Sequence, residues 1–400
     1  MLPLLSLSTE VFFWLLTLGL LVLTVLFWHK LVTRNLRTVT ARFTSIILIQ
    51  VLALASMGIT INRSGEFYSS WSDLFGAQGQ YQKIALSPAD LAQISIKEIS
   101  SAKKTKGGSL IFRKVIKGAS SGVANVVYVV ASPKVAASLE GPTHSIGNSY
   151  QIVELFPGTP GVPQTWIGTL DGITTMEELE NANKIPPTIA VIPAINVQPG
   201  HDTECMDFAF GVRVETWITK DMRTFMQTFM GIDNRLWSSF GYSTGGWCAA
   251  EVAVLHQDQY SQGVSLAGYF KPLLSIGLTK REKSYLTAKY DLIAHLAHGP
   301  RNTKIMIIAS VKDRFANSAA QKFMKSANSL IPIKYIPIPM GGHNIKVWKP
   351  FIASGFLWIS GANNLQTPVI QPAPKSTPAS TPTQTSTPIP TSTSVSGSQK

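Results

Sequence analysis

Two long apolar stretches lie near the start of the chain, at residues 11–28 and 43–61. The first carries no charge and has about the length needed to cross the hydrocarbon core of a bilayer. The second is diluted by Gln50 and several hydroxyl side chains, yet it is long enough for the same purpose. The pattern predicts a pair of transmembrane helices, and two buried core helices are the alternative.

The connection between these stretches determines their expected orientation. It contains four basic residues and no acid: Lys30, Arg34, Arg37 and Arg42. The positive-inside rule therefore predicts a two-pass membrane protein whose connection is cytoplasmic and whose remaining chain lies outside the cytoplasm. A cleaved signal peptide is the rival for the first stretch, but Glu10 is the only charge before it and no small-residue cleavage site follows promptly.

From about residue 109 onward, short apolar segments alternate with longer amphipathic ones. The expected strands are residues 110–117, 123–130, 150–156, 188–194, 237–240, 263–267, 304–310 and 333–338. The expected helices are residues 216–230, a run from 246 onward, and residues 282–298, 316–329 and 345–359. Such alternation predicts an α/β fold with a mostly parallel, doubly wound sheet. The first two strands have no helix between them and should pair antiparallel, and Pro337 should keep the last strand at an edge.

The same pattern divides the chain into four parts. Residues 1–62 form the expected hairpin, 63–106 a polar spacer with a short helix near 87–99, 107–362 the α/β domain, and 363–400 a tail. The tail is rich in Pro, Ser and Thr and has too little apolar bulk to form a core, so it should be disordered. A glycosylated or wall-threading tail and an inert one are both compatible with that composition.

Composition and charge exclude some classes of function. The net charge of +13 comes from 35 basic and 22 acidic residues, but the basic side chains are scattered, without an arginine stripe or interleaved aromatics. A nucleic-acid interface is therefore not expected. Cys205 and Cys248 allow at most one internal disulfide, and a buried free thiol at Cys248 is equally compatible with the sequence.

The segment 241–245 reads Gly-Tyr-Ser-Thr-Gly and lies between an apolar strand and a helix of small residues. A serine hydroxyl is a poor nucleophile unless a tight turn exposes it beside a base, and flanking glycines allow such a turn without Cβ clashes. The turn also places the serine at a helix N-terminus, where free N–H groups stabilise a developing oxyanion. Ser243 is therefore the candidate nucleophile.

A serine nucleophile needs a histidine base and a carboxylate that orients the base. Asp313 follows the strand at 304–310, and His343 follows the last strand after two glycines. The carboxyl ends of parallel strands meet at one edge of the sheet, and the order Ser, acid, His is the one used on α/β-hydrolase folds. The sequence thus predicts a catalytic triad of Ser243, Asp313 and His343.

An oxyanion hole requires two backbone donors beside the nucleophile. The N–H of Thr244, the residue after Ser243, is the first candidate. The second is the N–H of Thr159, in the Pro-Gly-Thr-Pro-Gly loop at 157–161 that follows an expected strand. The glycines of that loop permit close approach of its backbone to the serine.

A further loop, which carries His201, Asp202 and Glu204, should overhang the same edge of the sheet. Contact with a substrate and hydrogen bonding within the loop are both open for these side chains. His295 and His298 have a spacing of three residues, but no third ligand accompanies them, so no metal site is expected. No cofactor is expected either.

Together these residues resemble the esterase branch of the α/β-hydrolases. That branch includes esterase D and S-formylglutathione-hydrolase-like enzymes and the mycolyltransferases of mycobacterial and corynebacterial envelopes. The resemblance covers about residues 109–360 and rests on the 157–161 loop, the 241–246 turn, Asp313, and Gly342-His343 followed by Trp348. It implies a serine ester hydrolase or acyltransferase, in a membrane-anchored form of actinobacterial type. One departure is Pro157, because relatives usually carry His or Asp at that place.

The expected function is that of a membrane-anchored serine esterase that hydrolyses an acyl ester outside the cytoplasm, with a glycolipid or other cell-envelope component as a candidate substrate. The alternative is a mycolyltransferase-like acyltransferase, in which a sugar hydroxyl rather than water accepts the acyl group. A wall-binding protein with an inactive hydrolase domain is the third hypothesis, against which the intact triad argues.

Overall fold

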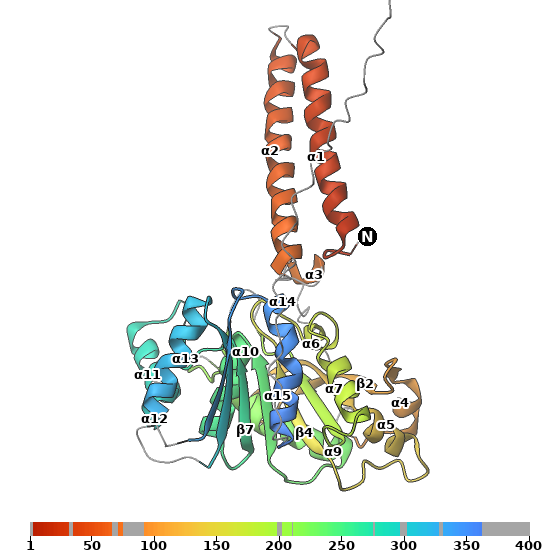
Figure 1. Ribbon diagram of the computed structural model, residues 1–400, viewed down its shortest axis with the longest axis vertical. Helices are drawn as coiled ribbons and strands as arrows, with labels where there is room; N and C mark the ends of the chain where they lie inside the picture. Colours follow the sequence, from red (N-terminus) through yellow and green to blue (C-terminus); the bar gives the residue numbers. More distant parts are fainter. Residues whose placement is uncertain are drawn as a thin grey trace, which may run out of the picture. The chain divides into compact units, whose positions relative to one another are not determined.

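The computed structural model describes residues 3–31, 35–65, 71–74, 92–197, 202–209, 211–274, 277–296, 302–327 and 331–361. The expected tail at 363–400 and half of the expected spacer (66–70 and 75–91), including the start of the helix near 87–99, lie outside these ranges. The description that follows concerns an N-terminal helical hairpin and a large α/β domain (Figure 1).

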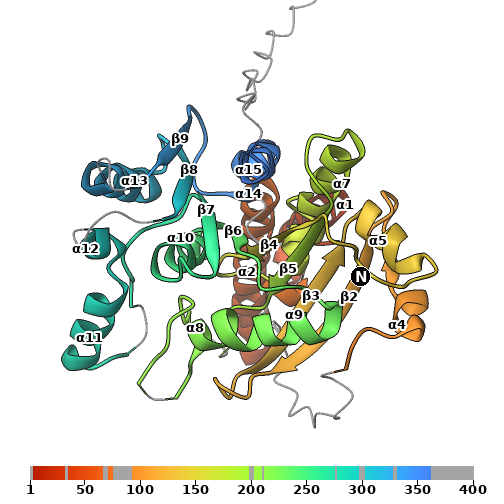
Figure 2. The same cartoon turned by 90° about the horizontal axis from the view of Figure 1, so that it is seen from below.

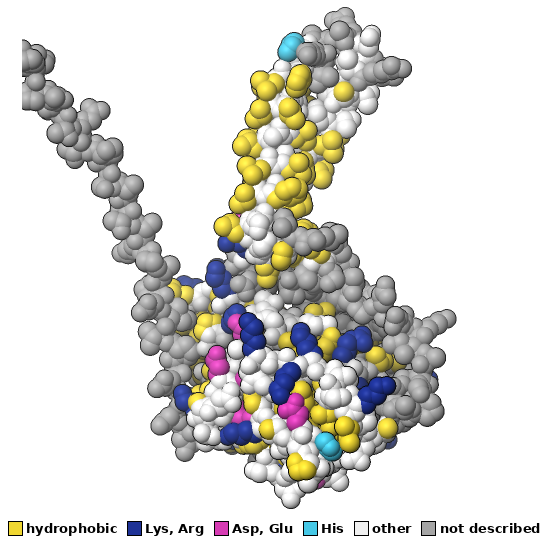
Figure 3. Space-filling model, turned by 90° about the vertical axis from the view of Figure 1, so that its right-hand side faces the viewer, with side chains coloured by type: hydrophobic (Ala, Val, Ile, Leu, Met, Phe, Trp, Pro, Cys, Tyr) yellow, Lys and Arg dark blue, Asp and Glu magenta, His cyan; other side chains and the backbone are white. Residues whose placement is uncertain are grey.

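The hairpin consists of α1 (Leu7–Phe27) and α2 (Leu36–Gly65), which lie side by side with the short turn η1 (Trp28–Leu31) at the end of α1. Both helices are long and apolar enough to cross a membrane, judged by length and composition. Many large apolar side chains of both helices are exposed, and Figure 3 shows apolar side chains along the hairpin.

Polar side chains on the two helices of the hairpin bind one another. Arg63 and Thr60 both donate to the carboxylate of Glu10, each at 2.8 Å. Thr17 and Ser56 share a buried hydrogen bond of 3.0 Å. Paired polar groups of this kind are needed within an apolar environment, because an unpaired donor or charge there is costly.

One nine-stranded sheet forms the centre of the α/β domain, with the order β1-β2-β3-β5-β4-β6-β7-β8-β9. Its strands are β1 (Lys103–Lys104), β2 (Leu110–Lys117), β3 (Ala124–Ala131), β4 (Gln151–Phe156), β5 (Thr188–Pro193), β6 (Trp237–Tyr242), β7 (Tyr260–Leu266), β8 (Lys304–Ser310) and β9 (Ile333–Ile338). The pairs β1–β2, β2–β3 and β3–β5 are antiparallel, and the remaining pairs are parallel. The expected antiparallel start and edge position of the last strand are both present.

Helices cover both faces of the sheet, as Figure 2 shows. On one face α9 (Met222–Met230), α10 (Thr244–Leu255) and α13 (Arg314–Ala327) contribute to a large buried core with the inward side chains of β2 to β8. On the other face lie α7 (Gly172–Asn181) and α15 (Ile352–Ile359), where Phe240 of β6 contacts the rings of Phe356 and Trp166. The doubly wound α/β architecture predicted from the sequence is confirmed.

The α/β domain begins before residue 107, contrary to the expected boundary. Helix α4 (Ile96–Ser101) has a capping box formed by Ser95 and Glu98, and its Ile99 is buried in the core. Strand β1 then adds to the edge of the sheet beside β2. This segment was assigned to the spacer because its composition is polar. The buried side chain of Ile99 and the pairing of β1 with β2 attach it to the domain. Two further parts of the expected spacer are described: the end of α2, which extends to Gly65, and the small α3 (Trp71–Leu74).

Several expected helices are interrupted. The helix expected at 282–298 is two helices, α11 (Lys280–Tyr290) and α12 (Leu292–Leu296), separated at Asp291. The last expected helix divides into α14 (Ile345–Trp348), the turn η4 (Lys349–Phe351) and α15, because Pro350 cannot donate an intrahelical hydrogen bond. The helix expected at 216–230 comprises α8 (Val214–Thr216), the π-helical turn η3 (Trp217–Asp221) and α9.

Within the described α/β domain, three helices were not predicted: α5 (Pro133–Glu140), α6 (Gln164–Ile167) and α7. They occupy the long connections on either side of β4. Their apolar positions are few, and α5 and α6 are short, so neither produces a long amphipathic period in the sequence.

Glu154 is a fully buried carboxyl group in the middle of the sheet, on β4. The hydroxyl of Tyr260 on β7 donates to its Oε2 at 2.5 Å. Burial raises the pKa of Glu154 to about 8, against the opposing effects of this hydrogen bond and of the charge on Arg223. The folded protein therefore holds a proton at Glu154 across a pH range in which the unfolded chain has released it.

We expect the free energy of unfolding to fall as the pH rises from about 5 to about 8, because the raised pKa stabilises the folded state only while Glu154 is protonated. Glu154→Gln keeps the shape and removes the titration, so its stability should decline less over the same range. With about 1.4 kcal/mol for each pKa unit, the two proteins should diverge by a few kcal/mol. Urea unfolding of the full chain at several pH values measures this difference, with the exposed Glu178→Gln on α7 as control. Parallel pH profiles for wild type and Glu154→Gln would contradict the assignment.

Candidate active site

The sharp turn between β6 and α10 carries Ser243. Its φ of 55° and ψ of −123° are rare for a residue with a side chain. The glycines around it allow this turn: a Cβ at Gly241 would lie 1.9 Å from the carbonyl oxygen of Gly245, and one at Gly245 would lie 2.2 Å from that of Phe156. The local sequence thus forces the serine out of the end of the strand at the carboxyl edge of the sheet.

Ser243, His343 and Asp313 come together at this edge. Oγ of Ser243 lies 2.9 Å from Nε2 of His343, and Nδ1 of His343 lies 2.5 Å from Oδ2 of Asp313. Asp313 follows β8 and precedes α13, whereas His343 lies in the loop between β9 and α14. The arrangement has the contacts of a nucleophile, a base and an orienting acid.

The environment of Asp313 keeps its side chain ionised. Burial alone would raise its pKa, since the side chain is only 5% exposed. Hydrogen bonds from His343 and from the backbone N–H groups of Ala316 and Phe315, together with the positive charge that His343 carries when it is protonated, outweigh that effect and hold the pKa of Asp313 below its ordinary value. The side chain of His343 is 38% exposed, so solvent reaches the base.

A cavity of about 220 Å³ opens beside Ser243. Gly158, Thr159, Pro160 and Trp348 are among the residues that line this cavity. The Gly158 backbone approaches the nucleophile so closely that a Cβ there would lie 3.1 Å from the Cβ of Ser243. The two residues expected to donate to an oxyanion thus flank Ser243: Thr159 lines this cavity, and Thr244 is the first residue of α10, where the N–H has no intrahelical acceptor.

Asp202 contacts both of these residues. Its Oδ2 accepts a hydrogen bond of 3.0 Å from the hydroxyl of Thr244, and its Oδ1 accepts one from the N–H of Glu204. The hydroxyl of Thr159 donates to Oδ1 of Asn196 at 3.0 Å and lies close enough to the Asp202 carboxylate to lower its pKa. Burial raises the pKa of Asp202, and these hydrogen bonds oppose the rise. Asp202 therefore joins the two loops that flank Ser243.

Glu204 does not point toward the cavity beside Ser243. It is buried, and its carboxylate accepts from the N–H groups of Leu273 and Leu274 and from the hydroxyl of Tyr269. Burial is the main cause that raises its pKa to about 7, and the charge on Asp202 raises it further. In the expected substrate loop, Glu204 thus binds other residues of the protein, Asp202 contacts Thr244, and His201 lies outside the described residues.

Cys205 and Cys248 form a disulfide in the structure. The bond joins the loop that carries Asp202 to the second turn of α10. Trp247, the residue before Cys248, donates from Nε1 to the carbonyl of Glu204 at 2.8 Å. The helix that carries the nucleophile is thus covalently attached to the loop beside it.

A second cluster of titratable groups lies at the other end of α10. Glu215, Glu251 and His256 each place one ligand atom within 4.8 Å of the others. Both oxygens of the Glu215 carboxylate are already paired, one with His256 at 2.8 Å and the other with the ammonium of Lys289 at 2.7 Å. The cluster is therefore a charge network, and it contains neither of the histidines weighed as a metal pair. His295 contacts the carbonyl of Lys289, and His298 lies outside the described residues.

Sequence reasoning missed three residues of the site. Tyr242 and Asn344 line the cavity beside Ser243, and Asn196 binds the side chain of Thr159. Tyr242 and Asn344 are direct neighbours of Ser243 and His343 in the chain, and Asn196 follows β5 at the same edge of the sheet. A search for polar residues just after each expected strand finds Asn196.

Comparison with known protein families finds none that matches the chain. Over 230 residues it is 23% identical to an uncharacterized protein of Corynebacterium glutamicum, a match that covers 54% of each of the two chains. The chain thus spans about half the length of the curated relative that it matches.

Solved structures are similar over more of the chain. An S-formylglutathione hydrolase from Agrobacterium tumefaciens is 13% identical with a TM-score of 0.53, covering 66% of this chain and 98% of that one. A ferulic acid esterase is also 13% identical, with a TM-score of 0.51 over 64% of this chain and 98% of that one. At such low identity the similarity concerns the fold. The chain therefore has the α/β-hydrolase fold, and the solved structures that it resembles are esterases.

Proposed function

We propose that this protein is a serine esterase, anchored in a membrane by its N-terminal hairpin, that hydrolyses an acyl ester outside the cytoplasm. The observation that carries the proposal is the chain of contacts from Ser243 through His343 to Asp313, at 2.9 and 2.5 Å. A chain of this kind activates a hydroxyl that is otherwise a poor nucleophile.

In the first half of the reaction, Oγ of Ser243 attacks the carbonyl carbon of the ester while Nε2 of His343 takes its proton. The ionised Asp313 stabilises the imidazolium that forms. The N–H groups of Thr244 and Thr159 are the proposed donors to the oxyanion of the tetrahedral intermediate. Its collapse transfers the proton from His343 to the leaving alcohol and leaves the acyl group on Ser243.

In the second half, a water molecule gives a proton to His343 and attacks the acyl-enzyme, which releases the carboxylic acid and restores Ser243. The exposure of His343 supports water as the acceptor, because solvent reaches the base directly. Transfer to a sugar hydroxyl uses the same residues and differs in the acceptor alone. The small cavity beside Ser243, walled partly by Trp348 and Ile345, suits a compact apolar group next to the ester carbonyl.

Two independent features support a location outside the cytoplasm. The basic connection between α1 and α2 predicts that the chain after α2 is outside. The disulfide between Cys205 and Cys248 is a bond that persists in oxidising compartments and is rare in the cytosol. The physiological ester is expected to be an extracellular or cell-envelope component.

Ser243→Ala should abolish both labelling by a fluorophosphonate and hydrolysis of a short-chain aryl ester, because among the described residues no other hydroxyl contacts His343. We expect a fall in kcat on the order of a thousandfold or more. The exposed Ser138→Ala on α5 serves as control and should keep both activities. Labelling retained in Ser243→Ala, or absent from the wild type, would refute the nucleophile.

Asp202→Ala should lower kcat by about tenfold and leave KM nearly unchanged, since it removes a contact to Thr244 at the start of α10 and to the loop of Thr159, which carry the proposed oxyanion donors. Asp202→Asn keeps an acceptor oxygen and should recover most of the rate. Thr244→Val removes the partner hydroxyl but not the backbone N–H, so it should resemble Asp202→Ala. Steady-state kinetics with an aryl ester measure these effects, and a raised KM with unchanged kcat would instead assign Asp202 to substrate binding.

The proposed topology predicts the labelling pattern of two engineered cysteines in intact cells. A membrane-impermeant maleimide should label Ser138→Cys in the α/β domain, because that domain is expected outside. Thr33→Cys, in the connection between α1 and α2, should be labelled only after the membrane is permeabilised. Labelling of Thr33→Cys but not Ser138→Cys in intact cells would reverse the proposed orientation.

A further inference from the structure

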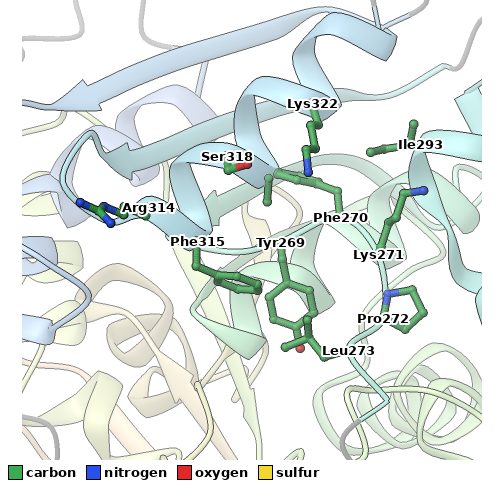
Figure 4. A pocket seen from close by; sticks show the side chains of 11 residues that line it. Tyr269, Phe270, Lys271, Pro272, Leu273, Ile293, Arg314, Phe315, Ser318 and Lys322 are labelled. Atoms are coloured by element: carbon green, nitrogen blue, oxygen red, sulfur yellow. The ribbon is translucent and has the colours of Figure 1, made fainter.

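A second and larger cavity, of about 700 Å³, lies at the same edge of the sheet as Ser243. It is formed by the segment after β7 together with α12 and the first turns of α13 (Figure 4). The rings of Tyr269, Phe270 and Phe315 gather at its centre. Phe315 and Leu273 are about half exposed, at 49% and 52%, so the cavity presents apolar surface to solvent.

Three basic side chains, Lys271, Arg314 and Lys322, line this cavity, and none of the described residues that line it is acidic. Figure 4 shows Arg314 at one end, Lys271 at the other, and Lys322 reaching from α13 toward the ring of Phe270. Lys271 pairs with Asp291 at 2.6 Å. Within the described part of the chain, Arg314 and Lys322 form no ion pair, so two positive charges are available to a ligand.

Residues that line this cavity are neighbours of the candidate active site in sequence and in packing. Arg314 and Phe315 directly follow Asp313, and the N–H of Phe315 contributes to the binding of its carboxylate. The ring of Tyr269 contacts Phe315 at 5.8 Å and stacks on Trp247 at 5.4 Å. Trp247 follows Ser243 by four residues at the start of α10, which is about 6 Å along a helix.

An apolar surface bordered by unpaired cations matches the chemistry of an anionic amphiphile. Burial of the ligand's apolar part against Phe315 and Leu273 contributes binding free energy but does not fix the ligand's orientation. A carboxylate or phosphate group that reaches Lys322 or Arg314 fixes that orientation. A neutral lipid gains only the first of these contributions, and free phosphate gains only the second.

We propose that this cavity binds the distal, acidic part of the substrate, so that the enzyme selects acyl esters with an apolar chain that ends in a carboxylate or phosphate group. This inference rests on the proposed esterase function of Ser243. It assigns Lys322 and Arg314 as specificity-determining residues, distinct from the residues that carry out the reaction.

The test compares two 4-nitrophenyl esters of the same chain length, 4-nitrophenyl octanoate and the mono-4-nitrophenyl ester of octanedioic acid. We expect a higher kcat/KM for the acidic ester at low ionic strength. Lys322→Gln should reduce that preference by roughly two- to fivefold, the effect of one exposed ion pair, and should leave the rate with the neutral ester unchanged. Added salt should reduce the preference in the wild type as well.

Lys325→Gln is the matched control, because Lys325 is exposed on the same helix but does not line the cavity. Hydrolysis of both esters with no preference, or a preference that Lys322→Gln and Lys325→Gln change equally, would overturn the inference.

Calorimetric titration of decanoate into Ser243→Ala separates this inference from the proposed function. Binding should weaken when Lys322→Gln is added and stay the same when Lys325→Gln is added. If decanoate binds with this dependence on Lys322 but the wild type hydrolyses neither ester, the proposed esterase function is refuted and the anion-binding cavity is supported. If the wild type hydrolyses the esters but decanoate does not bind in this way, the proposed role of the cavity is refuted and the esterase function is supported.

Discussion

The site depends on how closely α10 approaches the ends of β4, β6 and β7. Only a hydrogen atom fits at Gly241, Gly245 and Gly246, because a Cβ at these positions would come within 3 Å of backbone carbonyl oxygens. This contact forces Ser243 into its strained turn and directs the first N–H groups of α10 toward the carboxyl edge of the sheet. The positions of the nucleophile Ser243 and of one proposed oxyanion donor, the N–H of Thr244, therefore both depend on these three glycines.

Those parts of the fold and site that depend on local sequence were predictable. The alternation of apolar segments gave the doubly wound sheet, and the predicted resemblance to esterases is confirmed at the level of the fold. The triad could be predicted because Asp313 and His343 follow strands directly, and parallel strands end at a common edge. The structure brings the three side chains into contact, and their catalytic role remains a proposal.

Contacts between distant segments could not be predicted. Asp202 and Glu204 lie two residues apart in one loop and were expected to share a role, yet one contacts the threonines beside Ser243 and the other binds the backbone at Leu273 and Leu274. The left-handed backbone of Glu204, with φ of 47°, separates the two side chains. The early start of the domain was missed for a related reason. Ile99 is one apolar residue in a polar segment, and its burial depends on core side chains that are distant in the sequence.

The segment from Asp202 to Cys205 links the two cavities. Asp202 contacts Thr244 beside the small cavity, Glu204 holds the backbone and Tyr269 beneath the large one, and Cys205 is bonded to the helix that carries Ser243. Burial raises the pKa of Glu204 to about 7, because it disfavours the ionised form of this side chain. The ionised form is the one that accepts both hydrogen bonds from the Leu273 and Leu274 N–H groups most strongly. The disulfide constrains the same segment covalently and does not depend on that protonation. In an oxidising compartment, the attachment of this segment to α10 is therefore maintained even where the charge of Glu204 changes.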